Sequence, residues 1–594
     1  LNYEIFKGLK ARAFFAYDYT NLAQKEMKTA CTFYTYDSVQ DTYNPITKVA
    51  KGELMEKTQP YYKTTQQYSL NYKNTFNDLH DVEALALWEW KETNTNWFMA
   101  RRYYSTTSAI PELDRGDVDN MYNEGNSAVY KYGGLVGRLN YVYAGKYMAE
   151  FSFRYDGSYK TAPDKRWGFF PAVSAGWRIS EEQFMKDLVP QMDNLKLRAS
   201  WGSIGNDSQL NASQFVSGWQ FEDRFILGGA GNSSASITNG MKEANLANPN
   251  ITWYKVMTTN VGLDGSFWGG KLSFEFDYFY RKTTGYPATR NTSLPTTSGI
   301  PLPQENLNSS DNRGFELSLG TVQRIGNVNL QIKGNVAYAR EKDLYKEQAL
   351  PLNQYKNWRD NGAYRWKNVT WGYEHIGQFQ SYDEIYNSPI QDGKGNSSLR
   401  PGDIKYKDLN GDGLIDANDE KVIGKGTFPD LNFGLTLAAD WKGFDVNILF
   451  QGASNYTQVL NALTSPFRGP GEGNGFRVWM DSWHKADYND PDSEWVPGKF
   501  PSLRIEGNDN NSKKSTYWTT DAYYVRLKSI EIGYTIPKNL LSKVGIEHLR
   551  VYANAYNPLT ITNVKYTDPE AIEGWQSFYY PQLKVYSFGV NVSF

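Results

Sequence analysis

The chain has 594 residues, of which 15% are aromatic, and its formal net charge is −2. The near-neutral charge and the lack of a block of clustered Lys and Arg argue against a nucleic-acid partner, because phosphate binding requires such clusters. The mean hydropathy is −0.63, and no run approaches the ~20 apolar residues of a membrane-spanning helix. These values do not exclude a membrane β-barrel, whose alternating strands average to a polar composition.

Period-two alternation of apolar and polar residues predicts β-strands along the whole chain. In KYMAEFSFRYD, Tyr147, Phe151 and Tyr155 fall on one face, while Glu150 and Arg154 fall on the other. The same alternation recurs in later segments, namely Leu272–Arg281, Val328–Tyr338, Leu431–Leu437, Phe444–Phe450 and Tyr586–Phe594. The sequence therefore predicts an all-β protein.

Charges on the polar faces of these strands favour a membrane barrel over a large soluble β-sandwich or a propeller. Glu150, Arg154, Glu275 and Asp277 carry full charges, which a water-filled lumen accommodates. The strands are expected to run for about ten residues, as a tilted membrane strand requires. The sequence shows no blade repeat of the kind that marks a propeller.

The connections between the predicted strands alternate between short and long. The short ones are Tyr143–Lys146, Phe267–Lys271, Gln323–Asn327, Asp440–Phe444 and Pro537–Gly545, the last with room for one short helix. The long ones are Asn206–Asn250, Thr283–Asp311, Glu341–Asp430, Tyr456–Asp521 and Asn557–Leu583. This alternation is typical of a transmembrane antiparallel β-barrel with short periplasmic turns and long extracellular loops.

About fifteen or sixteen strands are predicted. The last strand follows a long loop, which predicts a periplasmic C-terminus.

Several segments also resemble a known family. The most characteristic are YGGLVGRLNYVYAGKYMAEFSFRYDGS (Tyr132–Ser158), LKLRASWGSIGN (Leu195–Asn206), RPGDIKYKDLNGDGLIDANDE (Arg400–Glu420) and YPQLKVYSFGVNVSF (Tyr580–Phe594). In these segments the chain resembles the SusC/RagA family of TonB-dependent outer-membrane transporters of Bacteroidetes. The resemblance covers nearly the whole chain.

The resemblance implies both an architecture and a function. Residues 1–594 are expected to be the C-terminal part of a large plugged barrel, because nothing in them resembles the plug domain or the TonB box of the family. The implied function is import of oligosaccharides across the outer membrane, coupled to the TonB complex through the N-terminal region. The implied partners are a SusD-like surface lipoprotein and outer-membrane lipid.

The stretch DLNGDGLIDAND resembles a calcium-binding loop. Its oxygen-bearing residues follow the spacing of an EF-hand loop, with Gly413 at the sharp turn. The predicted ligands are Asp408, Asn410, Asp412, the carbonyl of Leu414, Asp416 and Asp419. Because no flanking helices are predicted, the calcium ion is expected to brace a long loop and not to act as a switch. The alternative is an acidic surface turn, since NGDG is also strong turn chemistry.

Aromatic and polar residues in the long loops are candidates for sugar contacts. Sugar rings stack on aromatic side chains, and their hydroxyls pair with planar polar groups. The predicted substrate-binding residues are Trp358, Asp360, Tyr364, Trp366, Trp371, Trp479 and Trp483. The alternative is that these side chains pack the loops or form the aromatic girdle at the membrane interface.

No catalytic constellation is found, so the chain is not predicted to be an enzyme. Its four histidines are far apart and show no metal-ligand spacing. Two alternatives to glycan import remain open: a peptide importer of the same family, and an outer-membrane adhesin or scaffold without a transport role. A full-length sequence that lacks a plug and a TonB box would favour the adhesin or scaffold.

Overall fold

The computed structural model describes most of the chain. The described residues are 1–105, 110–119, 121–212, 214–227, 236–290, 302–349, 351, 353–460, 463–464, 476–504, 509–541, 545–571, 580 and 582–594. The chain divides into two compact units, which are treated separately below. Unit 1 contains Leu1–Ala175, Gly202–Lys255 and Thr296–Asn306, and unit 2 contains Gly176–Trp201, Val256–Pro295 and Leu307–Phe594.

Unit 1 is built on long antiparallel strands that pair in chain order. They are β1 (Asn2–Phe6), β2 (Leu9–Lys28), β5 (Gly52–Phe76), β6 (His80–Tyr104), β7 (Tyr122–Tyr143) and β8 (Tyr147–Ser158). Two separate hairpins are formed by β3 (Cys31–Asp37) with β4 (Thr42–Val49), and by β11 (Gly218–Leu227) with β12 (Ser236–Asn245). Strands β5 and β6 have 25 residues each, so the predicted length of about ten residues is wrong for them.

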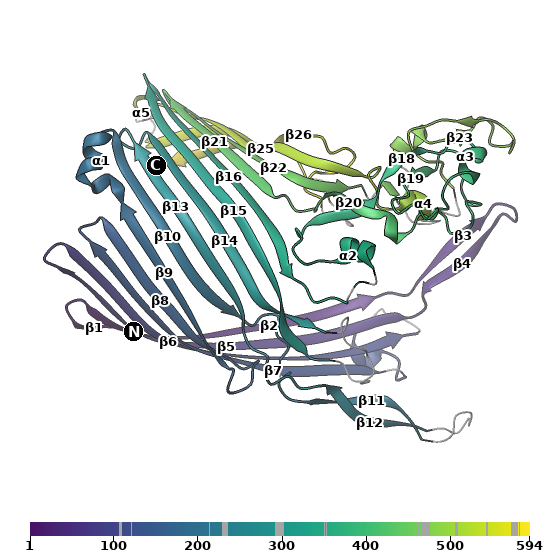
Figure 1. The fold of residues 1–594 in the computed structure, drawn as a ribbon, viewed down its shortest axis with the longest axis horizontal. Coiled ribbons are helices and arrows are strands. Elements are labelled where there is room, and N and C mark those ends of the chain that lie inside the picture. The colour runs from purple at the N-terminus through teal and green to yellow at the C-terminus, as the bar shows by residue number, and fades with distance from the viewer. Residues whose placement is uncertain are drawn as a thin grey trace. The chain divides into compact units, whose positions relative to one another are not determined.

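Unit 2 continues the same antiparallel pattern, and Figure 1 shows β16, β21, β22, β25 and β26 side by side. The paired strands are β15 (Gln304–Ile325), β16 (Val328–Tyr345), β21 (Leu431–Trp441), β22 (Phe444–Val459), β25 (Thr519–Thr535), β26 (His548–Thr562) and β27 (Val585–Ser593). Strands β10 (Met192–Asn206), β13 (Tyr254–Phe267) and β14 (Leu272–Thr289) lie mostly in unit 2, and β9 (Trp167–Arg178) lies mostly in unit 1. Across the described residues the sheet has 17 strands, more than predicted, because polar strands such as β5 show little alternation.

Helices are few and short. They are α1 (Gln183–Leu188), α2 (Gln354–Asp360), α3 (Tyr382–Tyr386), α4 (Asp509–Ser512) and α5 (Lys538–Leu541). Across the described ranges, none has the length and apolar character needed to cross a membrane. Helix α5 lies in the connection Pro537–Gly545, where the sequence predicted one short helix.

The predicted short turns are confirmed. In FWGGK, between β13 and β14, Trp268 and both following glycines have positive φ, at 57°, 68° and 76°. The N–H groups of Gly269 and Gly270 donate to the carboxylate of Asp193 at 2.9 and 2.8 Å, which holds this strained turn in place. The predicted loop Thr283–Asp311 is shorter than expected, since β14 extends to Thr289 and β15 begins at Gln304.

The register keeps apolar residues on one face of the sheet. Phe315 of β15 lies opposite Tyr338 of β16, and Leu317 lies opposite Val336. This face is exposed, as Leu319 illustrates at 48%. A continuous exposed apolar face needs a partner surface, and lipid provides one for a sheet of this kind.

Candidate functional site

The opposite face of the sheet carries ion pairs that link strands, in some cases across an intervening strand. In unit 1, Arg154 of β8 lies 3.6 Å from the carboxylate of Glu89 on β6. In unit 2, Arg198 of β10 lies 2.6 Å from Asp264 of β13 and 3.0 Å from Asp277 of β14. Charged side chains are costly on a lipid-facing surface. This face is therefore the one that meets water, as predicted for Arg154 and Asp277.

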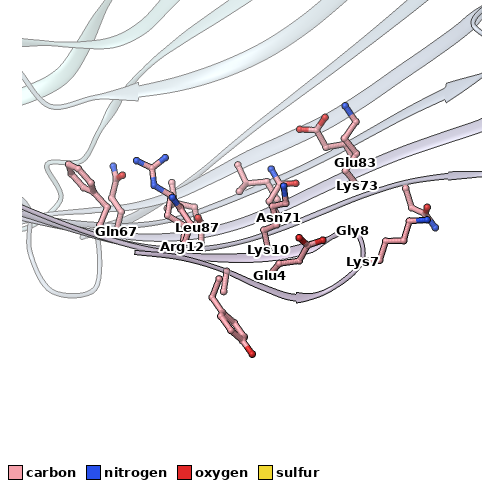
Figure 2. Close-up of a pocket in the computed structure, with 17 residues that line it drawn as sticks. Glu4, Lys7, Gly8, Lys10, Arg12, Gln67, Asn71, Lys73, Glu83 and Leu87 are labelled. Carbon is pink, nitrogen blue, oxygen red and sulfur yellow. The ribbon is translucent and has the colours of Figure 1, made fainter.

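A cavity of about 1090 Å³ lies on the polar face of unit 1, near the turn between β1 and β2. Lys10 and Arg12 of β2, Asn71 and Lys73 of β5, and Glu83 of β6 line it, and they rise from the same side of the sheet (Figure 2). The lining combines four Lys or Arg side chains with two Glu side chains. Such a surface suits polar solutes or the polar surface of another segment.

Two long loops of unit 2 fold together into what we call the loop module, made of the described residues in 346–430 and 460–518. It contains α2, α3, α4, β17 (Val369–Tyr373), β18 (His375–Gln378), β19 (Ile404–Tyr406), β20 (Glu420–Lys425), β23 (His484–Lys485) and β24 (Trp495–Val496). Its core comprises Ile404, Tyr406 and Ile415 from the first loop with Leu463, Trp479, Phe500 and Trp518 from the second. Figure 1 shows the module at one end of the unit 2 strands. A shared core orders both loops at that end.

A buried ion pair joins the same two loops. The carboxylate of Asp403 and the guanidinium of Arg504 are 0% and 5% exposed, and they contact each other directly. Asn511 donates to Asp403 at 2.7 Å, and its side-chain oxygen accepts from the N–H of Ile404 at 3.0 Å. Because a buried charge needs both a counter-charge and hydrogen bonds, this cluster fixes how the loops meet.

The predicted calcium loop lies between β19 and β20. The carboxylate of Asp408 accepts from the N–H groups of Gly411 and Gly413 at 2.7 and 2.9 Å. Burial opposes its ionisation, but the backbone donors outweigh burial and lower the pKa of the Asp408 carboxyl. Asp419 is fully buried and accepts from the N–H groups of Leu409 and Asp416 at 2.8 and 2.9 Å.

These contacts order the backbone of the loop. The residue types suit calcium, which prefers carboxylate and carbonyl oxygens. However, no three His, Cys, Asp or Glu side chains in the described part of the chain are grouped so that they could hold a metal ion. The calcium assignment to Asp408, Asn410, Asp412, Leu414, Asp416 and Asp419 therefore stays a prediction.

Chelation tests this assignment. If calcium braces the loop as predicted, EDTA should increase protease cleavage within residues 408–419 of the full-length protein. Asp408→Ala should increase cleavage, since it removes two hydrogen bonds worth together about 1–3 kcal/mol. Asp412→Ala is the milder control, since its carboxylate accepts one backbone N–H, from Leu414. Unchanged cleavage with EDTA would show that the hydrogen bonds of Asp408 and Asp419 hold the loop without calcium.

A second buried cation anchors the loop that follows β26. Strand β25 has a bulge between Leu527 and Ser529, and a bulge reverses which side chains face each side of a sheet. Leu527 therefore lies opposite Phe450 on the apolar face, whereas Arg526 lies opposite Gln451 on the polar face. Without the bulge, the guanidinium would point to the lipid side.

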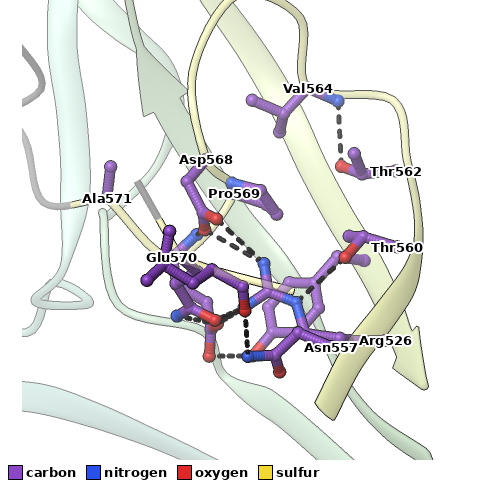
Figure 3. Close-up of polar contacts among 12 residues, drawn as sticks. Arg526, Asn557, Thr560, Thr562, Val564, Asp568, Pro569, Glu570 and Ala571 are labelled. Atoms are coloured by element: carbon purple, nitrogen blue, oxygen red, sulfur yellow. Dashed lines mark hydrogen bonds and ion pairs between the residues drawn. The ribbon is translucent and has the colours of Figure 1, made fainter. Parts of the chain in front are cut away.

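Arg526 is 3% exposed, and its guanidinium is surrounded by acceptors (Figure 3). It donates to both carboxylate oxygens of Asp568 at 3.0 and 3.1 Å and to the hydroxyl of Thr560 at 3.0 Å. It also contacts Glu570 and Gln582. We call this set the Arg526 clamp. It holds the segment after β26 against the polar face of the sheet.

The family model described as "TonB dependent receptor-like, beta-barrel" matches residues 6–558. The chain belongs to this family. Among curated proteins, it is 28% identical to TonB-dependent receptor P3 of Formosa agariphila, over 98% of this chain and 58% of that protein. It is 26% identical to TonB-dependent receptor SusC of Bacteroides thetaiotaomicron, over 77% and 43% respectively. The chain thus spans about half the length of the curated relatives it matches.

Two solved structures share the fold. "Structure of the RagAB peptide transporter" matches with a TM-score of 0.75 at 21% identity, over 100% of this chain and 61% of that one. The RagAB peptide importer in its 'open-open' state matches with a TM-score of 0.77, also at 21% identity, over 100% and 60%. The predicted all-β barrel fold and the resemblance to SusC and RagA are therefore confirmed.

Within this TonB-dependent receptor-like barrel, two of the predicted substrate residues are buried. Trp479 belongs to the core of the loop module. Trp483 is 5% exposed, lies against Gly402 and donates from its indole N–H to Gln378 at 3.4 Å. We correct the prediction for both indoles, because side chains enclosed in this way pack the loops and are not available to a solute.

Trp366 lies beside strand β16, and its role in substrate binding stays a prediction. It pairs with Lys342 at the end of β16, and Lys342 shares the apolar face of that strand with Tyr338. The guanidinium of Arg340 lies 4.3 Å from the centre of the Trp366 ring. An indole beside cations at the rim of the apolar face fits the interfacial aromatic girdle, which was the alternative considered for this residue.

The remaining predicted residues lie on the loop module. Trp358 and Tyr364 are exposed, and Trp371 is half-buried in β17. Asp360 forms an ion pair with Arg359 at 2.6 Å. The role of these four residues in substrate binding stays a prediction.

Proposed function

We propose that the protein is the barrel portion of an outer-membrane importer of oligosaccharides that is energised through TonB. The observation that carries this proposal is the sheet itself, with an exposed apolar face and an ion-paired polar face in a family of TonB-dependent receptors. A wide barrel lined in this way passes large polar solutes and requires a plug to gate it.

The proposal includes an orientation and a partner. The short turns and the C-terminus would be periplasmic, and the C-terminal residues do lie at the short-turn end, since Ser593 pairs with His548. The loop module would then face the outside, where its rigid core offers a broad surface to a SusD-like lipoprotein. TonB would act through residues beyond this chain.

Peptide import is the second candidate. It is favoured by the RagAB structures, which are named as a peptide transporter and share the fold. Oligosaccharide import is favoured by the resemblance to SusC and by the aromatic, polar composition of the long loops.

Deletion of the full-length gene in its host separates the two. We expect loss of uptake of one labelled oligosaccharide class, with labelled peptides still taken up, and rescue by the intact gene. Loss of peptide uptake alone would favour peptide import over oligosaccharide import. Normal uptake of both, together with a full-length chain that lacks a TonB box, would favour an adhesin or scaffold.

A further inference from the structure

A cavity of about 560 Å³ lies between the loop module and the loop held by the Arg526 clamp. It is formed by the short helical turn Arg477–Asp481, by Lys499 and Phe500, and by Tyr566. All these residues belong to unit 2. The volume falls in the range of small-molecule sites, about 300–1,000 Å³.

The cavity has an aromatic wall. Tyr566 is 46% exposed, and its ring centre lies 6.4 Å from that of Phe500. Its hydroxyl accepts from the ammonium of Lys499 at 3.2 Å. Met480 adds an apolar side chain that is 84% exposed. Exposed apolar groups that cluster around a cavity are typical of a binding surface, whereas scattered ones are not.

Tyr566 is held in this position at a cost. Its φ is 70°, a region that bulky residues rarely adopt. The strain persists because the surrounding contacts over-determine the segment: Val564 is packed in a buried cluster with Tyr456 and Tyr524, and Asp568 is bound by Arg526. The clamp therefore acts as the support that presents this ring to the cavity.

Positively charged side chains outnumber negatively charged ones around the cavity. Arg477 and Lys499 are cationic, and Asp481 is the one carboxylate among the described lining residues. Lys499 is engaged with Tyr566, and Asp481 accepts from the N–H of Lys499 at 3.3 Å. Arg477 is exposed and makes no hydrogen bond or ion pair with any other described residue. Its planar guanidinium is suited to bidentate binding of a carboxylate.

We propose that this cavity is a subsite for a sugar unit that carries a carboxylate, so that the importer prefers uronate-containing oligosaccharides. The sugar ring would lie against Tyr566, its carboxylate would pair with Arg477, and Asp481 would accept from its hydroxyls. This inference rests on the proposed import of oligosaccharides and names the chemical class of the substrate.

Binding to the purified full-length protein tests the proposal. The probes are tetrasaccharides of galacturonate, guluronate and mannuronate, each compared by calorimetry with its methyl ester, which keeps the ring and removes the charge. We expect at least one acid to bind about tenfold or more tighter than its ester, as one charge-assisted pair would provide. Arg477→Gln should abolish this preference, while binding of the ester is retained.

Two further variants separate the roles. Tyr566→Ala should weaken the acid and the ester alike, because it removes the stacking surface. Lys565→Gln is the matched control, since Lys565 is exposed beside Tyr566 but does not line the cavity, and it should change neither affinity.

Three outcomes overturn the inference. If no acid binds better than its ester while neutral glycans are still imported, the subsite proposal fails and the importer proposal stands. If Lys565→Gln reduces the acid preference as much as Arg477→Gln, the preference arises from the overall positive charge of this surface and not from a specific site at Arg477. If no oligosaccharide binds and peptides are imported instead, both proposals fail.

Discussion

Replacing Arg526 with alanine should release the loop that follows β26. The guanidinium is 3% exposed, so its removal leaves the carboxylates of Asp568 and Glu570 close together without a counter-charge. Loss of one partner from a buried ion pair costs about 3–5 kcal/mol. Because these carboxylates are 23% and 25% exposed, we expect the lower end of that range. Hydrogen exchange should show loss of protection across residues 563–571, with the strands unaffected.

The chain offers a matched control for this experiment. Arg550 of β26 also binds two carboxylates, those of Asp445 and Glu531, but within the sheet. Arg550→Ala should therefore leave the loop protected. Adding Asp568→Asn and Glu570→Gln to Arg526→Ala should recover part of the protection, since these changes remove the uncompensated charges. Unchanged protection of residues 563–571 in Arg526→Ala would show that the clamp does not hold the loop.

The sequence predicts the sheet well because its signal is local. Alternation and turn residues are properties of a few neighbouring positions, and the turns at Ala144 and Trp268 occur where they were expected. The bulge in β25 was also visible in principle. In YYVRLKSIEIGYT, the apolar positions are odd-numbered at Val525 and Leu527 but even-numbered at Ile530 and Ile532. This change of parity is the sequence signature of an inserted residue.

The candidate site was much less predictable. Trp479 and Trp483 lie in loops of the right composition, yet they are buried because a second loop, distant in sequence, covers them. Likewise, nothing near Tyr566 in the sequence points to Lys499 or Phe500. Contacts of this kind depend on how two long loops fold against each other, and no local pattern encodes that arrangement. Arg504 and Arg526 were missed for the same reason, since Arg504 meets Asp403 across a separation of 101 residues and Arg526 meets Asp568 across a separation of 42.

Replacing Arg504 with alanine should disorder the loop module while the sheet stays folded. Asp403 is 0% exposed, so removal of Arg504 leaves its charge without a counter-charge in a buried position. The expected cost is about 3–5 kcal/mol, a large fraction of the 5–15 kcal/mol that stabilises an ordinary domain. Trp479 and Trp518 share the core that this pair joins. We therefore expect the near-ultraviolet circular dichroism of the indoles to fall, with the strand signal in the far ultraviolet retained.

A second substitution shows whether Arg504 orders the loop module through its charge or through its packing. Asp403→Asn in the Arg504→Ala background removes the uncompensated charge but leaves the lost side-chain volume unfilled. We expect it to restore part of the indole signal, because the amide oxygen can accept one of the two hydrogen bonds that Arg400 N–H and Asn511 donate to separate oxygens of Asp403. Arg477→Gln, an exposed arginine of the same loop, is the control and should leave the signal unchanged. If Asp403→Asn restores nothing, the arginine acts through its packing between the two loops, and the ion pair itself does not determine how they meet.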